Sequence, residues 1–164
     1  RYYCPSATFV MKADLPNFQV EFRHYSENRQ GGISSIIEAP SELVQGVIYE
    51  VPEEELIDLD ILESVPEGLY RRDTFLVRGE DGLWHKADLY RVANPTGPYP
   101  PSKEYLEDMI EGAQEHGLAP DYTAKLVALR QSLDHSNKNH ADVQPAIQQA
   151  AQHQCIGASN EGSC

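Results

Sequence analysis

Cysteine is scarce in this chain of 164 residues, which contains three: Cys4, Cys155 and Cys164. They are odd in number and far apart, which does not fit the disulfide framework of a small secreted domain and favours a reducing compartment. None has a histidine at metal-ligand spacing, so a zinc site is not expected. We therefore expect a cytoplasmic protein without a zinc site.

Basic residues are also scarce, since 13 lysines and arginines stand against 26 acidic residues and give a net charge of -13. This excess of negative charge argues against binding to nucleic acid or to an anionic membrane surface. No apolar run approaches the ~20 residues that a membrane-spanning helix needs. The length fits one domain with a real core. Nothing in the composition indicates an oligomeric state.

The first half of the chain is rich in strand signals. Six segments carry aromatic or β-branched residues and are separated by turn residues, as expected for strands. Gly79-Glu80-Asp81-Gly82 is a hairpin turn between the last two of them. The predicted strands are Ala7–Lys12, Phe18–Tyr25, Ile33–Glu38, Leu43–Val51, Tyr70–Arg78 and Trp84–Val92.

One helix is predicted between the fourth and fifth strands. It begins at or near Pro52, a residue that suits the first helical position, and continues through three glutamates that the helix dipole favours in the first turn. The predicted apolar face consists of Leu56, Leu59, Ile61 and Leu62. Together these elements predict an α+β fold, a small mixed or antiparallel β-barrel with one inserted helix followed by C-terminal helices.

The second half is predicted to be helical. Asn94–Pro101 is rich in proline and forms a rigid loop, after which Ser102 caps a helix that runs to about His116 and stops at Gly117. Pro120-Asp121 opens a further helix. Residues 135–164 are polar and are predicted to be a mostly disordered tail with a short helix near Val143–Ala151. The predicted domain therefore covers residues 1–134.

Glu63 is the first candidate for chemistry. It ends the acidic helix in the run Leu59-Asp60-Ile61-Leu62-Glu63-Ser64-Val65-Pro66-Glu67-Gly68-Leu69-Tyr70. A carboxylate at the point where a helix gives way to a turn among strands is well placed to enter a cavity and transfer protons. Position alone leaves the alternative of a solvated surface residue open, because the chain has 26 acidic residues.

Six short motifs in a fixed order raise Glu63 above the other acidic residues, and together the pattern resembles the γ-glutamylcyclotransferase-like family from about Pro5 to Leu129. Two early strands look like the family's first strand pair, and two glycine-containing strands match its "GG-I-apolar" and "V-x-G-V-apolar-Y/W" patterns. The matching segments are Pro5–Phe9, Leu15–Phe22, Gly31–Ile37, Val44–Val51, Leu59-Asp60-x-x-Glu63 and Pro101-Ser102-Lys103-Glu104-Tyr105.

The resemblance implies the family's fold, with Glu63 as catalytic acid and base and Tyr105 as a substrate contact. It also implies a strand with a Tyr-Gly-Ser-Asn-like loop, whose backbone N–H groups hold the γ-glutamyl part of the substrate. That loop is expected shortly before Arg1, so we expect residues 1–134 to lack the first strand of the fold.

Three further candidates have two interpretations each. Tyr105 either contacts substrate or packs the first turn of its helix, and Tyr70 either lines the mouth of the cavity or belongs to the core. Gly32 marks either a close backbone approach to a ligand or a bulge or turn. Arg71-Arg72 either attracts a substrate carboxylate or forms a solvated strand edge.

The reaction implied is the cyclisation of a γ-glutamyl amide to 5-oxoproline and a free amine, without water or cofactor. A single carboxylate can take a proton from the α-ammonium group and deliver one to the leaving nitrogen if burial raises its pKa. Two alternatives remain open. The first is an enzyme that cleaves a different amide on the same scaffold, and the second is a non-catalytic module that binds a small molecule.

Overall fold

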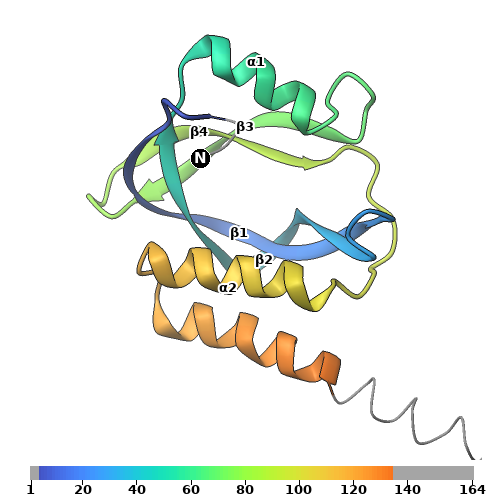
Figure 1. The fold of residues 1–164 in the computed structure, drawn as a ribbon. Helices are drawn as coiled ribbons and strands as arrows, with labels where there is room; N and C mark the ends of the chain where they lie inside the picture. The colour runs from blue at the N-terminus through green and yellow to red at the C-terminus, as the bar shows by residue number, and fades with distance from the viewer. Residues whose placement is uncertain (1–3, 135–164) are drawn as a thin grey trace, which may run out of the picture. The chain divides into compact units, whose positions relative to one another are not determined.

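Residues 4–134 are described in a computed structural model of the protein. Four strands form one antiparallel sheet in the order β2-β1-β3-β4, which confirms the predicted α+β class (Figure 1). Residues 120–134 are also helical. The predicted tail, 135–164, and its helix near Val143–Ala151 lie outside the described residues. The elements are β1 (Thr8–Ser26), β2 (Gly31–Glu50), α1 (Glu53–Leu62), β3 (Tyr70–Gly79), β4 (Trp84–Val92) and α2 (Lys103–Glu115).

The first four predicted strands are in fact two long ones, β1 and β2. The segments expected to be turns are irregularities inside paired strands: the register shifts between Pro16 and Phe18. There Asn17 has a φ of 64° and Ser41, on the facing strand, has a φ of 72°. The backbone N–H of Ser41 donates to Asn17 Oδ1 at 3.3 Å. Such bulges bend a strand without ending it. Residues that favour turns therefore lie here inside paired strands, where the sequence predicts strand ends.

The sheet is strongly curved. Strand β1 pairs with β3 only at Ala13 and Asp14, whereas β3 and β4 pair along their whole length as the predicted hairpin. The outer strands β2 and β4 also approach each other: the backbone N–H of Val92 on β4 donates to Ser35 Oγ on β2 at 3.1 Å. Within residues 4–134 no strand ladder joins β2 to β4, so closure into a full barrel stays a prediction.

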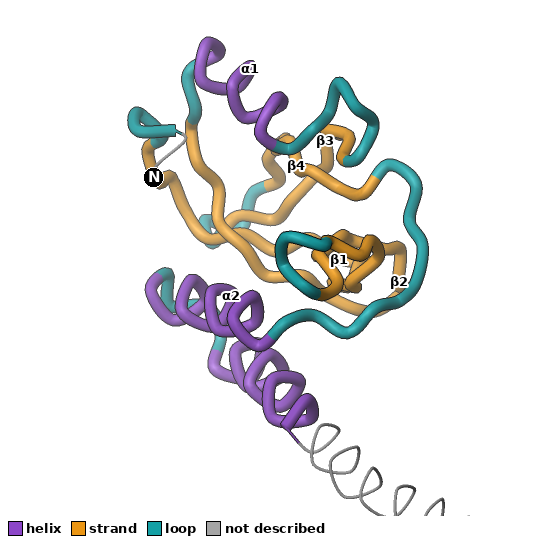
Figure 2. The backbone as a smooth tube through the Cα atoms, turned by 45° about the vertical axis from the view of Figure 1, so that its right-hand side comes forward, coloured by secondary structure: helices purple, strands orange, loops and turns teal. Residues whose placement is uncertain are grey.

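The core lies inside the curve of the sheet. Its buried members, Leu15, Ile36 and Val77, come from β1, β2 and β3, and seven half-buried apolar side chains pack around them. Helix α1 lies beside β3 and β4, whereas α2 runs along β1 and β2 on the other side (Figures 1 and 2). The sheet therefore separates the two helices that carry Glu63 and Tyr105.

Helix α1 begins where the sequence predicts, with Pro52 as its N-cap and three glutamates in its first turn. The predicted apolar face was wrong for two of its members, since Ile61 is 60% and Leu62 42% exposed. Leu56 and Leu59 are half-buried. The physical reason is that this helix covers a cavity, described below, and does not pack on a filled core.

Helix α2 confirms its predicted ends. The Ser102 side chain accepts a hydrogen bond from the backbone N–H of Tyr105 at 3.2 Å, and the helix stops before Gly117, whose φ is 60°. The loop before it is anchored to β1 and β2. Backbone N–H groups of Thr96 and Tyr99 donate to β1 carbonyls at 2.7 and 2.9 Å, and Gly32 N–H donates to Pro100 O at 2.8 Å. This loop fixes the position of the first turn of α2.

Candidate active site

Glu63 is the C-cap residue of α1, and its backbone N–H donates to Leu59 O at 2.9 Å. A tight turn follows, in which Ser64 takes a φ of 52° and Val65 N–H donates to Asp60 O at 2.9 Å. The Glu63 side chain is half-buried, and this burial raises the pKa of its carboxyl above the ordinary glutamate value. A raised pKa is the property that a carboxyl needs to exchange protons near neutral pH.

Tyr70 and Tyr105 meet at one residue, Ser34 on β2. The Tyr70 hydroxyl donates to the backbone carbonyl of Ser34 at 2.9 Å. Ser34 N–H donates to the Tyr105 hydroxyl oxygen at 3.3 Å, and the hydroxyls of Ser34 and Tyr105 lie 2.7 Å apart. The structure thus brings together two of the sequence-predicted site residues, although they come from β3 and α2.

Electrostatic interaction joins Glu63 to this pair. Burial raises the pKa of Tyr70, and the neighbouring Tyr105 and Glu63 raise it further. The Tyr70 phenol therefore stays protonated and can act as a hydrogen-bond donor throughout the physiological pH range. Glu63 thus interacts electrostatically with Tyr70, and Ser34, the residue that sequence reasoning missed, joins Tyr70 to Tyr105.

Gly32 lies two residues before Ser34 and is buried under the loop that precedes α2. A Cβ atom at this position would lie 2.5 Å from the carbonyl oxygen of Tyr99, and the backbone N–H already donates to Pro100. Neither interpretation made from the sequence named this contact. The glycine permits a close approach, and the group that approaches is a loop of the same chain.

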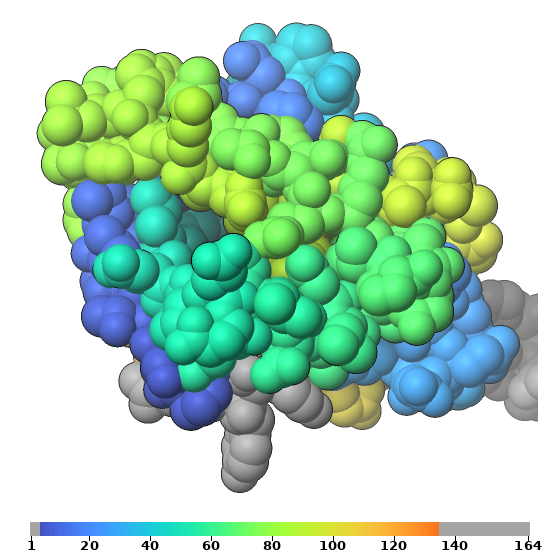
Figure 3. All heavy atoms as spheres, turned by 90° about the horizontal axis from the view of Figure 1, so that it is seen from above, coloured from blue at the N-terminus to red at the C-terminus, as the bar shows by residue number. Residues whose placement is uncertain are grey.

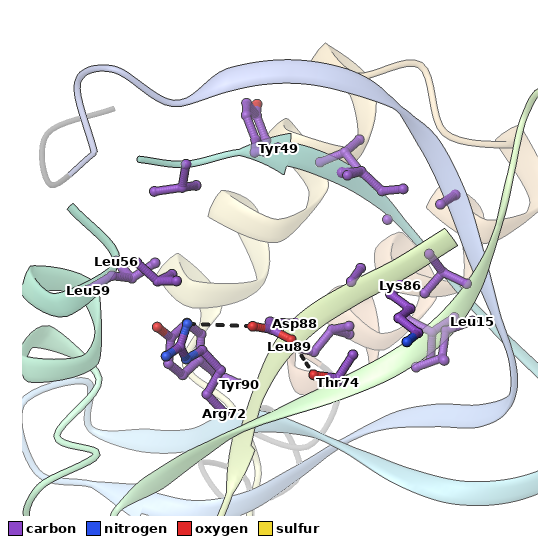
Figure 4. Close-up of a pocket in the computed structure, with 18 residues that line it drawn as sticks. Leu15, Tyr49, Leu56, Leu59, Arg72, Thr74, Lys86, Asp88, Leu89 and Tyr90 are labelled. Atoms are coloured by element: carbon purple, nitrogen blue, oxygen red, sulfur yellow. Dashed lines mark hydrogen bonds and ion pairs between the residues drawn. The ribbon is translucent and has the colours of Figure 1, made fainter. Parts of the chain in front are cut away.

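A cavity of about 500 Å³ lies between α1 and the sheet, lined by Leu56 and Leu59 of α1 and by residues of all four strands. Seen from the side of α1, the surface is hollowed between α1 and the β3–β4 hairpin (Figure 3). Its walls are mostly apolar, and Arg72, Thr74, Asp88 and Tyr90 form a polar cluster at one end (Figure 4). Glu63, Tyr70 and Tyr105 are not among the lining residues.

Tyr90 lies between the cavity and the C-terminal end of α1. Its side chain lines the cavity, and its hydroxyl donates to Asp60 Oδ1 at 2.5 Å. Burial raises the pKa of Tyr90, and the carboxylates of Asp60 and Glu63 contribute to the rise. Asp60 is the Asp of the "LD-x-x-E" pattern, so the motif contained a signal for this contact; the sequence offered none for Tyr90.

The two adjacent arginines have different surroundings. Arg71 is 50% exposed and pairs with Asp73 at 2.9 Å, as a solvated strand position would. Arg72 is 29% exposed, lines the cavity, and contacts both Asp60 at 3.2 Å and Asp88 at 3.5 Å. Of the two interpretations of this pair, the solvated edge fits Arg71 and does not fit Arg72.

Two further features bear on the kind of protein this is. Across residues 4–134, no group of three or more His, Cys, Asp or Glu side chains is arranged so that it could hold a metal ion. In the same part of the chain, no helix has the length and apolar character needed to span a membrane. A curved antiparallel sheet, a half-buried carboxyl and two linked tyrosines characterise this small α+β domain.

Comparison with known proteins gives the family. The profile of the AIG2-like family matches residues 43–126. The chain is 31% identical over 147 residues to a γ-glutamylcyclotransferase of Bos taurus, over 87% of this chain and 77% of that protein. It is 30% identical over 147 residues to the protein of the same name from Homo sapiens. A solved γ-glutamyl cyclotransferase structure aligns with a TM-score of 0.74 and 30% identity, covering 77% of each chain.

The chain belongs to the γ-glutamylcyclotransferase family. The resemblance inferred from the six motifs is confirmed, and so are the predicted fold class and the prediction of an enzyme of this type.

Proposed function

We propose that this protein converts a γ-glutamyl amide into 5-oxoproline and a free amine. The α-amino nitrogen of the substrate attacks its own γ-carbonyl carbon, and the bond from that carbon to the amide nitrogen breaks. The α-ammonium nitrogen loses two protons on its way to the lactam N–H. Glu63 takes each of them in turn and passes it to the leaving nitrogen, so that the amine departs as an ammonium group. Atoms and charges balance without water, metal or redox cofactor, because the nucleophile and the leaving group belong to one substrate.

The half-buried carboxyl of Glu63 is the observation that carries this proposal. Its raised pKa brings the proton affinity of the carboxylate closer to that of the groups it must exchange with, which favours both proton transfers. Its place after α1, in the motif that the family resemblance assigns to the catalytic glutamate, supports the same role. Orienting the glutamyl chain for ring closure can contribute ~7–11 kcal/mol.

The Ser34–Tyr105 pair supports a role in holding the substrate. The two hydroxyls carry two protons, and only one can lie in the 2.7 Å contact between their oxygens. The second proton is therefore left for an acceptor such as a substrate oxygen. The Tyr70 hydroxyl already donates its proton to Ser34 O, so we assign Tyr70 a structural role: it fixes β2 and forms part of the wall of the site. We assign Gly32 the role of allowing the loop before α2 to pack closely on β2.

The oxyanion that forms on the γ-carbonyl also needs donors. The resemblance assigns them to a Tyr-Gly-Ser-Asn-like loop, a motif that residues 1–164 do not contain. We propose that residues 1–134 form the catalytic domain and residues 135–164 a polar tail. We also place the reaction in the cytoplasm, since three widely spaced cysteines suit a reducing compartment.

Release of 5-oxoproline from a panel of γ-glutamyl amino acids and amines tests the proposal. The full-length protein is compared with its Glu63→Gln variant, which keeps the shape of the side chain and cannot exchange protons. We expect the variant to lose ~10²–10⁴-fold in kcat. Absence of release from every panel member, or release unaffected by Glu63→Gln, would leave a binding module or a different amide chemistry as the explanation.

A further inference from the structure

Helix α1 carries Glu63, yet apolar packing does little to fix it. None of its residues is buried, and Ile57 and Ile61 are both 60% exposed. Its two half-buried apolar side chains, Leu56 and Leu59, face the cavity (Figure 4). A helix that lies over a cavity can shift at little cost in apolar contact, since few side chains interlock with it. Other interactions must therefore define where Glu63 lies.

Polar contacts to Asp60 fix the position of the C-terminal end of α1. Asp60 lies three residues before Glu63; its Oδ1 accepts a hydrogen bond from Tyr90 Oη at 2.5 Å and forms an ion pair with Arg72 Nε at 3.2 Å. Arg72 Nη1 also contacts Asp88 Oδ2 at 3.5 Å. These contacts connect α1 to β3 and β4; the contact between Arg72 and Asp88 is visible in Figure 4. We call the three charged residues the Asp60–Arg72–Asp88 bridge.

The environment of the bridge makes it stronger than an ordinary surface ion pair. The side chains of Asp60 and Arg72 are 24% and 29% exposed, so solvent screens them less than it screens exposed pairs, which contribute little. Thr74 Oγ1 donates to the other Asp88 oxygen at 2.6 Å, which fixes the far end. An arginine suits this place because its planar fork can reach two carboxylates in fixed directions.

The other end of α1 has an independent attachment. The Ser6 backbone N–H donates to both oxygens of the Glu55 carboxylate at 3.2 Å. Loss of Arg72 would therefore leave the first turn of α1 attached through Glu55, while its last turn would be held to β4 only by the hydrogen bond from Tyr90 to Asp60. Glu63 follows that last turn directly, so its carboxylate would move the most.

We propose that Arg72 is a positioning residue for Glu63, acting through Asp60. Arg72 holds Asp60, and with it the end of α1, at a fixed place on β3 and β4, so that the Glu63 carboxylate meets the substrate in the geometry that proton transfer needs. The inference rests on the proposed function of Glu63. Arg72 lies outside the six motifs. It stands on β3, where Tyr70 is the other residue to which we assign a role in the site.

The test compares Arg72→Gln with Arg71→Gln in the full-length protein. Both variants lose one positive charge from adjacent positions of β3, and Arg71 lies outside the bridge. We expect Arg72→Gln to lower kcat about 10–100-fold, the scale of a 1 Å misplacement, with KM changed less than about threefold. Arg71→Gln should stay within about twofold of the parent in both constants. Arg72→Lys should restore part of kcat, because one ammonium group can still pair with Asp60.

Hydrogen–deuterium exchange gives a readout that does not depend on substrate. In Arg72→Gln the backbone amides of residues 60–65 should exchange several-fold faster than in the parent, whereas those of Arg71→Gln should be unchanged. Unchanged exchange in Arg72→Gln would overturn the proposal whatever the activity does. Faster exchange with unchanged kcat would also overturn it, because Glu63 would then not need the bridge. If the parent itself releases no 5-oxoproline, the proposed function fails, and the exchange result still decides whether Arg72 fixes α1.

Discussion

Ser34 holds Tyr105 twice, through its backbone N–H at 3.3 Å and through its hydroxyl at 2.7 Å. The carbonyl of the same residue accepts the hydroxyl of Tyr70 at 2.9 Å. One residue of β2 therefore fixes a tyrosine from β3 and another from α2, 36 and 71 residues away along the chain. The position of both phenols depends on the path of β2 at this point.

The Tyr70→Phe variant should loosen this arrangement. It removes the bond to Ser34 O, at an expected cost of about 1 kcal/mol in the free energy of unfolding, which lowers Tm by roughly 2–4 °C in a domain of this size. Because Ser34 also holds Tyr105, we expect KM to rise about 3–10-fold with a smaller change in kcat. Steady-state kinetics and thermal unfolding check both effects.

Tyr25→Phe is the matched control for that variant. Tyr25 is 40% exposed and lies outside the contacts around Ser34, so its loss of a hydroxyl should leave KM and Tm unchanged. Equal effects of the two variants would show that the bond between Tyr70 and Ser34 has no special importance.

The pH dependence of kcat/KM should show the pKa of Glu63 in the free enzyme. The carboxylate must be ionised to accept the substrate proton, so activity should rise with pH as Glu63 loses its own proton. Burial raises the pKa of this carboxyl, which puts the acid limb above the ordinary glutamate value of about 4.3. A limb at or below that value would contradict a buried catalytic carboxyl.

Stability should respond to Glu63 in the opposite direction from a paired carboxylate. The folded state holds the Glu63 proton more tightly than the unfolded state does, because burial raises the folded pKa. Stability from this group is therefore present below the unfolded pKa and is lost as pH rises through the folded pKa. At pH 7 the buried, ionised side chain destabilises the folded state, so Glu63→Gln should raise Tm by about 1–3 °C.

The same comparison at acid pH is the control for this effect. Below the unfolded pKa the parent carries a neutral carboxyl in both states, and the difference in Tm between parent and Glu63→Gln should shrink toward zero. A difference in Tm that does not change between pH 7 and pH 4 would mean that burial of the charge is not its cause.

Substitution of Gly32 should disturb the loop before α2. A Cβ at this position would lie 2.5 Å from Tyr99 O, a backbone atom that cannot rotate away. Overpacking of this kind costs about 1–3 kcal/mol, and we expect Gly32→Ala to lower Tm and to raise KM, since the same loop leads to Tyr105. Thermal unfolding and substrate saturation curves measure the two effects.

Gly46→Ala is the matched control on the same strand. An added Cβ at Gly46 meets nothing within 4 Å, and alanine loses less conformational entropy on folding than glycine does. This variant should keep the parental Tm or exceed it slightly. Destabilisation of both variants to the same extent would point to a general intolerance of β2, and the contact with Tyr99 would then not be the cause.

Local patterns predicted much of the fold correctly. The three glutamates after Pro52, the Ser102 cap and the glycines of the β3–β4 turn each predicted an element that the structure confirms. The prediction was wrong where the same residues are compatible with either a turn that ends a strand or a bulge within it. Asn17 and its neighbours form a bulge in a paired strand, because a long partner strand is present to continue the ladder.

The sequence by itself determined the family, the order of the elements and the place of Glu63 at the end of a helix, because these depend on residues that are neighbours in the chain. Only the tertiary structure decided that Ser34 joins Tyr70 to Tyr105 and that Arg72 lies between Asp60 and Asp88. The reason is geometric. These contacts depend on the curvature of the sheet and on the register of its strands, which many distant pairings set together and no local pattern records.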